Sequence, residues 1–181
     1  VGTYLEHKFE AYLVSKYDYE IGSSAKGIDF PGLNVDMKTT SIAQPQSSCP
    51  YKSARQKIYG LGYSILIFVY DKADNHKDRT GCLRIKHAIF IDKSRTADFQ
   101  TTTGIQMILE NNGNIDDIKA FFEERHLPVD DITANALAEE VLSNPPETGY
   151  LTISKEYRKP FNYERVIPNA GKVAGIMSLK F

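Results

Sequence analysis

The chain has 181 residues, 41% hydrophobic and 25% charged, with a net charge of −1, which is typical of one sizeable globular domain. It contains no apolar run of the roughly 18–20 residues that would cross a membrane and no secretory leader at its start. Its two cysteines, Cys49 and Cys82, lack metal-ligand spacing and exclude a disulfide framework, so we expect a cytoplasmic protein.

A helix is expected at the start of the chain, beginning near Tyr4 with Thr3 as its N-cap. Its apolar residues recur at the spacing that gathers side chains on one face of a helix: Leu5, Phe9, Tyr12 and Leu13. Glu6 lies at the edge of this stripe, where its carboxylate could add a ligand to a metal site. The alternative is an ordinary surface glutamate.

A strand is expected next, because apolar and polar residues alternate from Leu33 to Lys38. Side chains of a strand point to opposite faces with period two, so Leu33, Val35 and Met37 face a core. Asp36 and Lys38 then share the exposed face, roughly 7 Å apart at about 3.3 Å per residue. Asp29 precedes a Pro-Gly turn signal that can bring its carboxylate beside Asp36.

Two carboxylates and an ammonium that converge in this way suit phosphodiester hydrolysis. Hard oxygen ligands hold Mg²⁺ and leave positions for water and a phosphate oxygen. The Lys38 ammonium can orient the attacking water or stabilise charge that develops on the phosphate. The alternative is a strand whose solvent face is merely charged, since Glu6-His7-Lys8 and Asp117-Ile118-Lys119 also satisfy the acid-x-Lys pattern.

The segment after this strand is the main candidate for reading DNA bases. Gln can bond adenine bidentately, Arg or Lys can bond guanine, and Ser or Thr can serve bases or phosphates. The candidate DNA-binding residues are Thr39, Thr40, Ser41, Gln44, Gln46, Ser47, Lys52, Arg55, Gln56 and Lys57. The alternative is an ordinary polar connection.

Further along the chain, residues 52–61 predict a short helix, residues 63–70 a strand buried on both faces, and residues 82–92 one or two more strands. Residues 104–147 predict acidic helices, and residues 151–154 and 173–179 predict strands. Between the last two strands, basic and aromatic residues could grip a DNA backbone or lie half-buried at the surface: Tyr157, Arg158, Lys159, Tyr163 and Arg165.

Charge is segregated along the chain. Residues 104–147 hold ten acids and two bases, a net of −8, so the remainder carries +7. The face that carries the proposed site can therefore be electropositive while the acidic segment faces away from the phosphates. The alternative is a solvated acidic face without a partner.

Taken together, the motifs resemble the PD-(D/E)xK nuclease superfamily, and most closely type II restriction endonucleases. The resemblance covers roughly residues 1–93 and rests on Glu6, Asp29, the Asp36-Met37-Lys38 run, Thr39-Thr40-Ser41 and Gln56-Lys57. It implies that Asp29 and Asp36 bind the metal, that Lys38 serves the water and phosphate, and that Glu6 contributes. Ile28 departs from the family's proline.

The resemblance implies an α/β fold with a mixed central sheet flanked by helices, and Mg²⁺-dependent cleavage of double-stranded DNA. We expect one nuclease domain, 1–181: a catalytic core at 1–103, an acidic helical subdomain at 104–147 and C-terminal strands at 148–181. A homodimer and a methyltransferase that protects host DNA are the expected partners. The Gly-Thr-x-x-Glu opening also resembles Holliday-junction resolvases, and a non-catalytic DNA-binding module is a further alternative.

Overall fold

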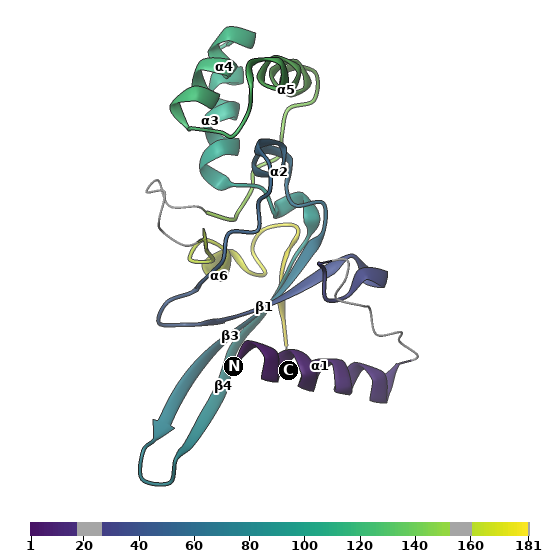
Figure 1. The fold of residues 1–181 in the computed structure, drawn as a ribbon, viewed down its shortest axis with the longest axis vertical. Coiled ribbons are helices and arrows are strands. Elements are labelled where there is room, and N and C mark those ends of the chain that lie inside the picture. Colours follow the sequence, from purple (N-terminus) through teal and green to yellow (C-terminus); the bar gives the residue numbers. More distant parts are fainter. Residues whose placement is uncertain (18–26, 153–160, 181) are drawn as a thin grey trace.

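A mixed four-stranded sheet forms the centre of the computed structural model, which describes residues 1–17, 27–152 and 161–180. Its strand order is β1-β3-β4-β6. Strand β1 (Val35–Ser41) runs parallel to β3 (Ser64–Asn75), whereas β4 (Thr80–Ile91) is antiparallel to both β3 and β6 (Ile176–Leu179). Helices cover this sheet, so the expected α/β fold with a mixed sheet is confirmed (Figure 1).

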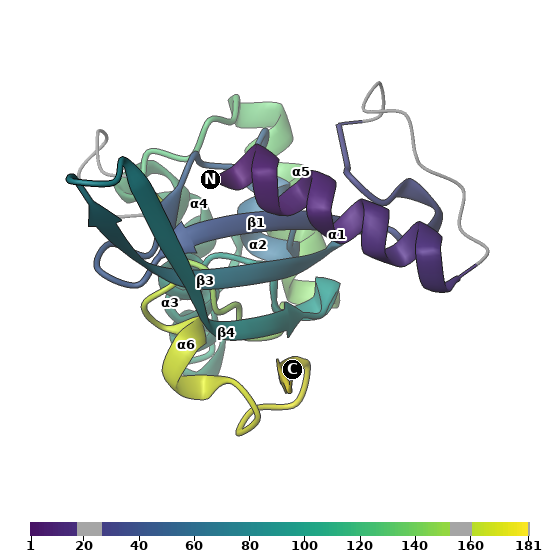
Figure 2. The ribbon, with the colours of Figure 1, turned by 90° about the horizontal axis from the view of Figure 1, so that it is seen from below.

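Helix α1 (Gly2–Lys16) lies across one face of the sheet (Figure 2). Leu5, Phe9 and Leu13 pack against a buried cluster that includes Met37, which confirms most of the predicted stripe. The prediction that Tyr12 belongs to this buried stripe is wrong, because Tyr12 lies about 100° around the helix from Leu13 and is 54% exposed. The expected cap is also wrong: the helix begins at Gly2 and places Thr3 inside it.

The other face of the sheet is covered by the C-terminal part of the chain. The buried isoleucines and valine of β3 and β4 pack in one cluster with Phe161, Tyr163 and Val166. Phe161 lies in β5 (Phe161–Asn162), Val166 lies in α6 (Val166–Asn169), and Tyr163 lies between the two elements. Strand β5 pairs with the short strand β2 (Gln46–Ser47). The segment after β1 is thus tied to residues that follow it by more than a hundred positions, a contact that no local pattern predicts.

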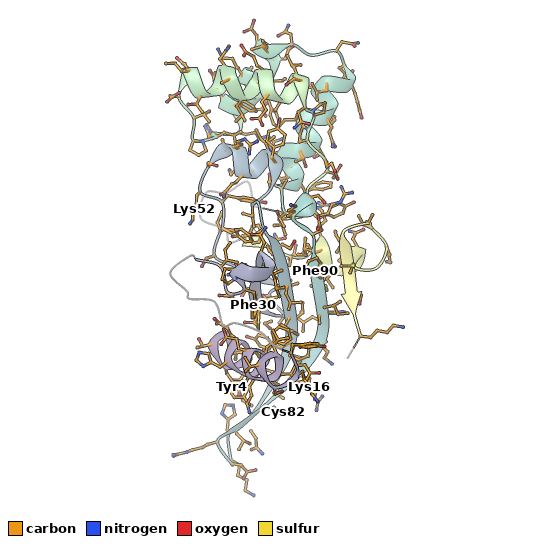
Figure 3. The ribbon with its side chains drawn as sticks, turned by 90° about the vertical axis from the view of Figure 1, so that its right-hand side faces the viewer. Tyr4, Lys16, Phe30, Lys52, Cys82 and Phe90 are labelled. Atoms are coloured by element: carbon orange, nitrogen blue, oxygen red, sulfur yellow. The ribbon has the colours of Figure 1, made fainter. Side chains whose placement is uncertain are left out.

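Strands β3 and β4 extend beyond the sheet as a two-stranded hairpin, whose tip forms one end of the molecule (Figure 1). Residues 72–82 of this hairpin are exposed, and Figure 3 shows Cys82 beyond α1. The predicted strands at 63–70 and 82–92 are confirmed as parts of β3 and β4. The continuation of β3 to Asn75 and the start of β4 at Thr80 are not predicted by the sequence pattern.

Four helices form a second hydrophobic core at the far end of the molecule (Figure 1). They are α2 (Ala54–Tyr59), α3 (Phe99–Glu110), α4 (Ile115–Glu124) and α5 (Asp131–Ser143). The predicted acidic helices and the helix within 52–61 are confirmed. Polar side chains cap each N-terminus, with Ser53, Asp98, Asn114 and Asp130 accepting hydrogen bonds from backbone nitrogens of the first turns. Helix α3 begins at Phe99, before the expected boundary at Gly104.

The C-terminal strand is shorter than the expected 173–179, because turns occupy residues 170–175 and Gly171 and Gly175 have positive φ. Of the expected strand at 151–154, Leu151 and Thr152 form isolated bridges, and residues 153–160, with Tyr157, Arg158 and Lys159, lie outside the described residues. The 3-10 turns η2 (Pro31–Leu33) and η3 (Lys93–Arg95) complete the elements. Within the described part of the chain, no helix is long and apolar enough to span a bilayer.

Candidate active site

A tight turn places Asp29 beside the strand that carries Asp36. Phe30 and Val35 exchange backbone hydrogen bonds of 2.9 and 3.2 Å across η2, and Asn34 closes the turn in the left-handed conformation at φ 54°. Met37 N then donates to Asp29 Oδ2 at 2.8 Å. The Pro-Gly turn signal is therefore confirmed, whereas the strand begins at Val35 and leaves Leu33 in the turn, 60% exposed rather than in the core.

Asp36 is only 4% exposed, so the expected exposed face is wrong for this residue. Lys38 Nζ lies 2.6 Å from Asp36 Oδ2, because the long lysine side chain bends back along the strand. Burial raises the pKa of Asp36, Lys38 lowers it, and Asp29 raises it through a hydrogen bond and through its charge, which leaves this pKa above its ordinary value. The two aspartates and the lysine therefore converge.

Glu6 faces the same region from α1. Its carboxyl is half-buried, and its pKa is raised by burial, by the charge of Asp29 and by the charge of Glu10, against smaller opposing effects of His7 and Lys38. Among residues 1–17, 27–152 and 161–180, no three His, Cys, Asp or Glu side chains lie close enough to surround a metal ion. Glu6 is thus within electrostatic reach of the aspartates without completing a ligand cage.

Two tyrosines border the aspartates, and neither was predicted to lie there: Tyr163 is buried, which corrects the expectation that it grips a DNA backbone or lies half-buried at the surface. The pKa of Tyr63 is raised to about 12 by burial and by the charges of Asp36 and Asp29. Tyr163 is 1% exposed, and burial together with the charge of Asp36 raises its pKa above the ordinary value, while a hydrogen bond with Ser47 lowers it. Parallel pairing sets Val35 opposite Ser64 and so brings Tyr63 near Asp36, a pairing that the sequence alone does not give.

The candidate DNA-binding residues after Asp36 divide into buried anchors and exposed groups. Thr39 and Ser41 lie in β1, and Thr40 is 3% exposed. The Thr40 hydroxyl points toward the carbonyl oxygens of Gln44, at 3.3 Å, and Gln46, at 3.1 Å. Ser47 Oγ and Tyr163 Oη share a hydrogen bond of 2.9 Å, whereas the Gln44 side chain is exposed at the loop surface.

The candidates around α2 are partly occupied by contacts within the protein. Arg55 donates to both carboxylate oxygens of Glu140 on α5, at 3.2 and 2.6 Å, and stacks on Tyr59. Gln56 accepts from Lys52 N at 2.7 Å, and Lys57 is half-buried. The Lys52 side chain is exposed and lies beside α2 at the edge of the molecule (Figure 3).

The aspartate pair has the chemistry of a site for a hard divalent cation. Two neighbouring carboxylates supply oxygen ligands, and Mg²⁺ is commonly held by one or two carboxylates while it keeps several waters. The charge of Asp29 raises the pKa of Asp36, so the two negative charges repel each other when both carboxyls are ionised. A bound divalent cation would relieve this repulsion, and the residues present therefore fit the metal.

Known proteins resemble the chain along almost its whole length. A family model described as type II restriction enzyme NspV matches residues 1–178. The type II restriction enzyme NspV of Nostoc sp. is 58% identical to the chain over 179 residues, which cover 99% of this chain and 81% of that protein. No solved structure matches the chain.

Proposed function

The chain belongs to the family of type II restriction enzyme NspV, and we propose that Asp29, Asp36 and Lys38 form its catalytic site. It is a type II restriction endonuclease, which binds double-stranded DNA and hydrolyses phosphodiester bonds, and enzymes of this kind use a divalent metal. The family therefore favours restriction over the junction-resolvase and non-catalytic alternatives. The observation that carries the proposed site is the convergence of two carboxylates and an ammonium at the start of β1.

Asp29 and Asp36 are the residues that would hold the metal, and we assign Mg²⁺ to them because both offer hard oxygen ligands. When bound, Mg²⁺ lowers the pKa of its water and polarises the phosphate. The backbone hydrogen bond from Met37 fixes the orientation of the Asp29 carboxylate relative to β1. Burial of Asp36 excludes water from one side of its carboxylate, which strengthens its electrostatic interactions.

Lys38 holds a positive charge at the position where the phosphate must approach Asp36. Its side chain is 34% exposed, so the ammonium can turn from Asp36 toward a bound phosphate without leaving the site. There it stabilises the charge that develops on the phosphate oxygens and orients the attacking water. Glu6 adds a carboxylate at the edge of the same site, where we propose that it assists the metal or its waters.

The exposed and half-buried candidates between Thr39 and Lys57 that were named above, which do not include Tyr51, are proposed to contact the DNA next to the cleaved phosphate. Exposed Gln44 and the half-buried Gln46 are the proposed base-reading residues, because their amides can bond adenine bidentately. Lys52, which is exposed, is proposed to bind phosphate. Arg55 must release Glu140 before its guanidinium can reach DNA.

The biological setting is proposed from the family as a restriction-modification system. We propose a homodimer in the cytoplasm, with a DNA methyltransferase as the functional partner that protects host DNA. A direct test of the catalytic assignment is to incubate the protein with phage and plasmid DNA in Mg²⁺. Discrete fragments from the wild type and intact DNA with Asp36→Ala support the site. Equal fragmentation by both proteins contradicts it.

A further inference from the structure

The loop that follows β1 turns back onto the strand that carries Asp36. Gln44 N donates to Ser41 O at 3.3 Å, and Gln46 N donates to Gln44 O at 2.9 Å. Thr40 Oγ1 lies 3.3 Å from Gln44 O and 3.1 Å from Gln46 O. Because Asp36, Lys38 and Thr40 alternate along β1, the hydroxyl that holds the loop lies on the same face of the strand as the proposed catalytic pair.

The C-terminal segment holds the same loop from its other side. Tyr163 N donates to Pro45 O at 2.8 Å, and β5 pairs Asn162 with Gln46 and Phe161 with Ser47. The hydrogen bond between Tyr163 Oη and Ser47 Oγ then closes this contact. The loop is thus fixed by side chains of Thr40 and Tyr163 as well as by backbone pairing.

Tyr163 also belongs to the surroundings of the catalytic carboxylate. Its ring is 1% exposed and packs edge-on against Phe161, with ring centroids 5.1 Å apart. Its hydroxyl is close enough for the Asp36 charge to raise its pKa. One buried side chain therefore contacts the proposed base-reading loop and borders the proposed metal site.

We propose that Tyr163, together with Thr40, is a positioning residue that sets sequence discrimination by fixing the 44–48 loop relative to Asp36 and Lys38. This inference rests on the proposed function of that loop. A rigid loop discriminates because a wrong base leaves unpaired those polar groups of the loop that become buried against DNA, whereas a loop that can shift accommodates the wrong base. Loss of the Tyr163 hydroxyl therefore lowers the preference for the correct site more than it lowers cleavage itself.

The test compares Tyr163→Phe with Tyr51→Phe. Tyr51 is a matched control, because its ring also packs against Phe161 and its hydroxyl donates to Thr96 O at 2.8 Å, outside the loop. The recognition site is first mapped with the wild type. For each variant, kcat and KM are then measured on a duplex with this site and on a duplex with one base pair changed, together with thermal unfolding to verify folding.

We expect Tyr163→Phe to lower the ratio of kcat/KM between the two duplexes by about fivefold, the effect of losing one neutral hydrogen bond. The ratio should fall mainly because Tyr163→Phe cleaves the changed duplex faster than the wild type does. Tyr51→Phe should keep the wild-type ratio. Thr40→Val should also lower the ratio, and Thr40→Ser, which keeps the hydroxyl, should restore it.

An unchanged ratio in Tyr163→Phe overturns the inference, and so does an equal loss in Tyr51→Phe, which would indicate a general effect of destabilising this core. Failure of the proposed catalytic site is recognised separately. In that case Asp36→Ala would still cleave the mapped site, whatever the ratio in Tyr163→Phe.

Discussion

Lys38 Nζ lies 2.6 Å from Asp36 Oδ2, and yet the pKa of Asp36 stays above its ordinary value. Burial and the neighbouring Asp29 together outweigh the ammonium. The protein thus holds a carboxylate in a place that disfavours its negative charge. A buried carboxylate with a raised pKa is typical of functional sites, where the folded state is less stable than it could be because a reactive group is held in position.

The first prediction concerns stability without metal. A carboxyl whose pKa is raised in the folded state contributes stability that is present below the unfolded pKa of about 3.9 and is lost as pH rises through the folded pKa. Asp36→Asn should therefore raise Tm at neutral pH, by about 2–4 °C for each kcal/mol of relief. The gain should shrink as pH falls through the folded pKa of Asp36 and should be lost below about 3.9, where the carboxyl is protonated in both states.

Asp92→Asn is the matched control for this measurement. The pKa of Asp92 is lowered by hydrogen bonds from Ser94, so its neutralisation should lower Tm at neutral pH. Calorimetry with added Mg²⁺ completes the experiment, since binding to the folded state stabilises it by mass action. Mg²⁺ should raise the Tm of the wild type and leave that of Asp36→Asn unchanged; an equal rise in both proteins would remove Asp36 from the metal site.

The second prediction is that Asp36→Ala abolishes cleavage while DNA affinity stays within a few fold of the wild type, because a metal ligand is lost and no phosphate-binding cation is removed. Asp29→Ala should behave in the same way. Replacing Mg²⁺ by Ca²⁺ should permit binding without cutting, because the larger ion is a poorer Lewis acid for this step. Gel shift and cleavage assays on one duplex measure both effects. Undiminished cleavage by either variant would contradict the assignment of Asp29 and Asp36 to the metal site.

The parts of the site that the sequence predicts are those encoded in neighbouring residues. The alternation of Val35, Asp36, Met37 and Lys38 predicts a strand, and the Pro-Gly turn predicts that Asp29 lies beside it. Leu33 breaks this pattern because Asn34 adopts the left-handed conformation, so the strand starts later. A period-two pattern does not reveal where a turn ends.

The parts that the sequence does not predict depend on distant contacts. Asp36 is buried near Tyr63 and Tyr163, and Ser47 bonds to Tyr163, which lies 116 residues further along the chain. The extension of β3 to Asn75 is not predictable from the sequence for another reason. Its residues are exposed, and the strand is held there by backbone pairing with β4, so no hydrophobic pattern marks it.

The third prediction concerns the charge of the helical end of the molecule. Glu140→Gln should free Arg55 and strengthen DNA binding, with a log-log salt dependence steeper by about one unit if Arg55 then reaches a phosphate. Stability should fall by less than about 1 kcal/mol, because the Arg55 side chain is 62% exposed and that of Glu140 is 33% exposed, so solvent screens the pair. Glu123→Lys with Glu124→Lys is the control and should barely change affinity, since these two acids lie on α4, the part of the acidic segment that is expected to face away from DNA.

Fluorescence anisotropy at several salt concentrations measures this difference. Lys52→Ala should move the slope in the opposite direction, by about one unit for the lost phosphate contact. A larger effect of the Glu123 and Glu124 reversals than of Lys52→Ala would place the acidic helices against DNA and contradict the proposed orientation.

The fourth prediction is that the protein acts as a homodimer on a short symmetric site. One chain carries a single proposed site and can hydrolyse one strand, while a double-strand break needs two cuts. Two-fold pairing supplies the second site, and matched half-sites follow from the symmetry of the dimer.

Replacing Gln44 or Gln46 with Ala should then relax the base preference at symmetric positions of the recognition site, by about 1–3 kcal/mol per bidentate contact. Sedimentation with and without the mapped duplex, together with mapping of both cuts, tests the dimer; a monomer that nicks one strand, or cuts without dyad symmetry, would rule it out.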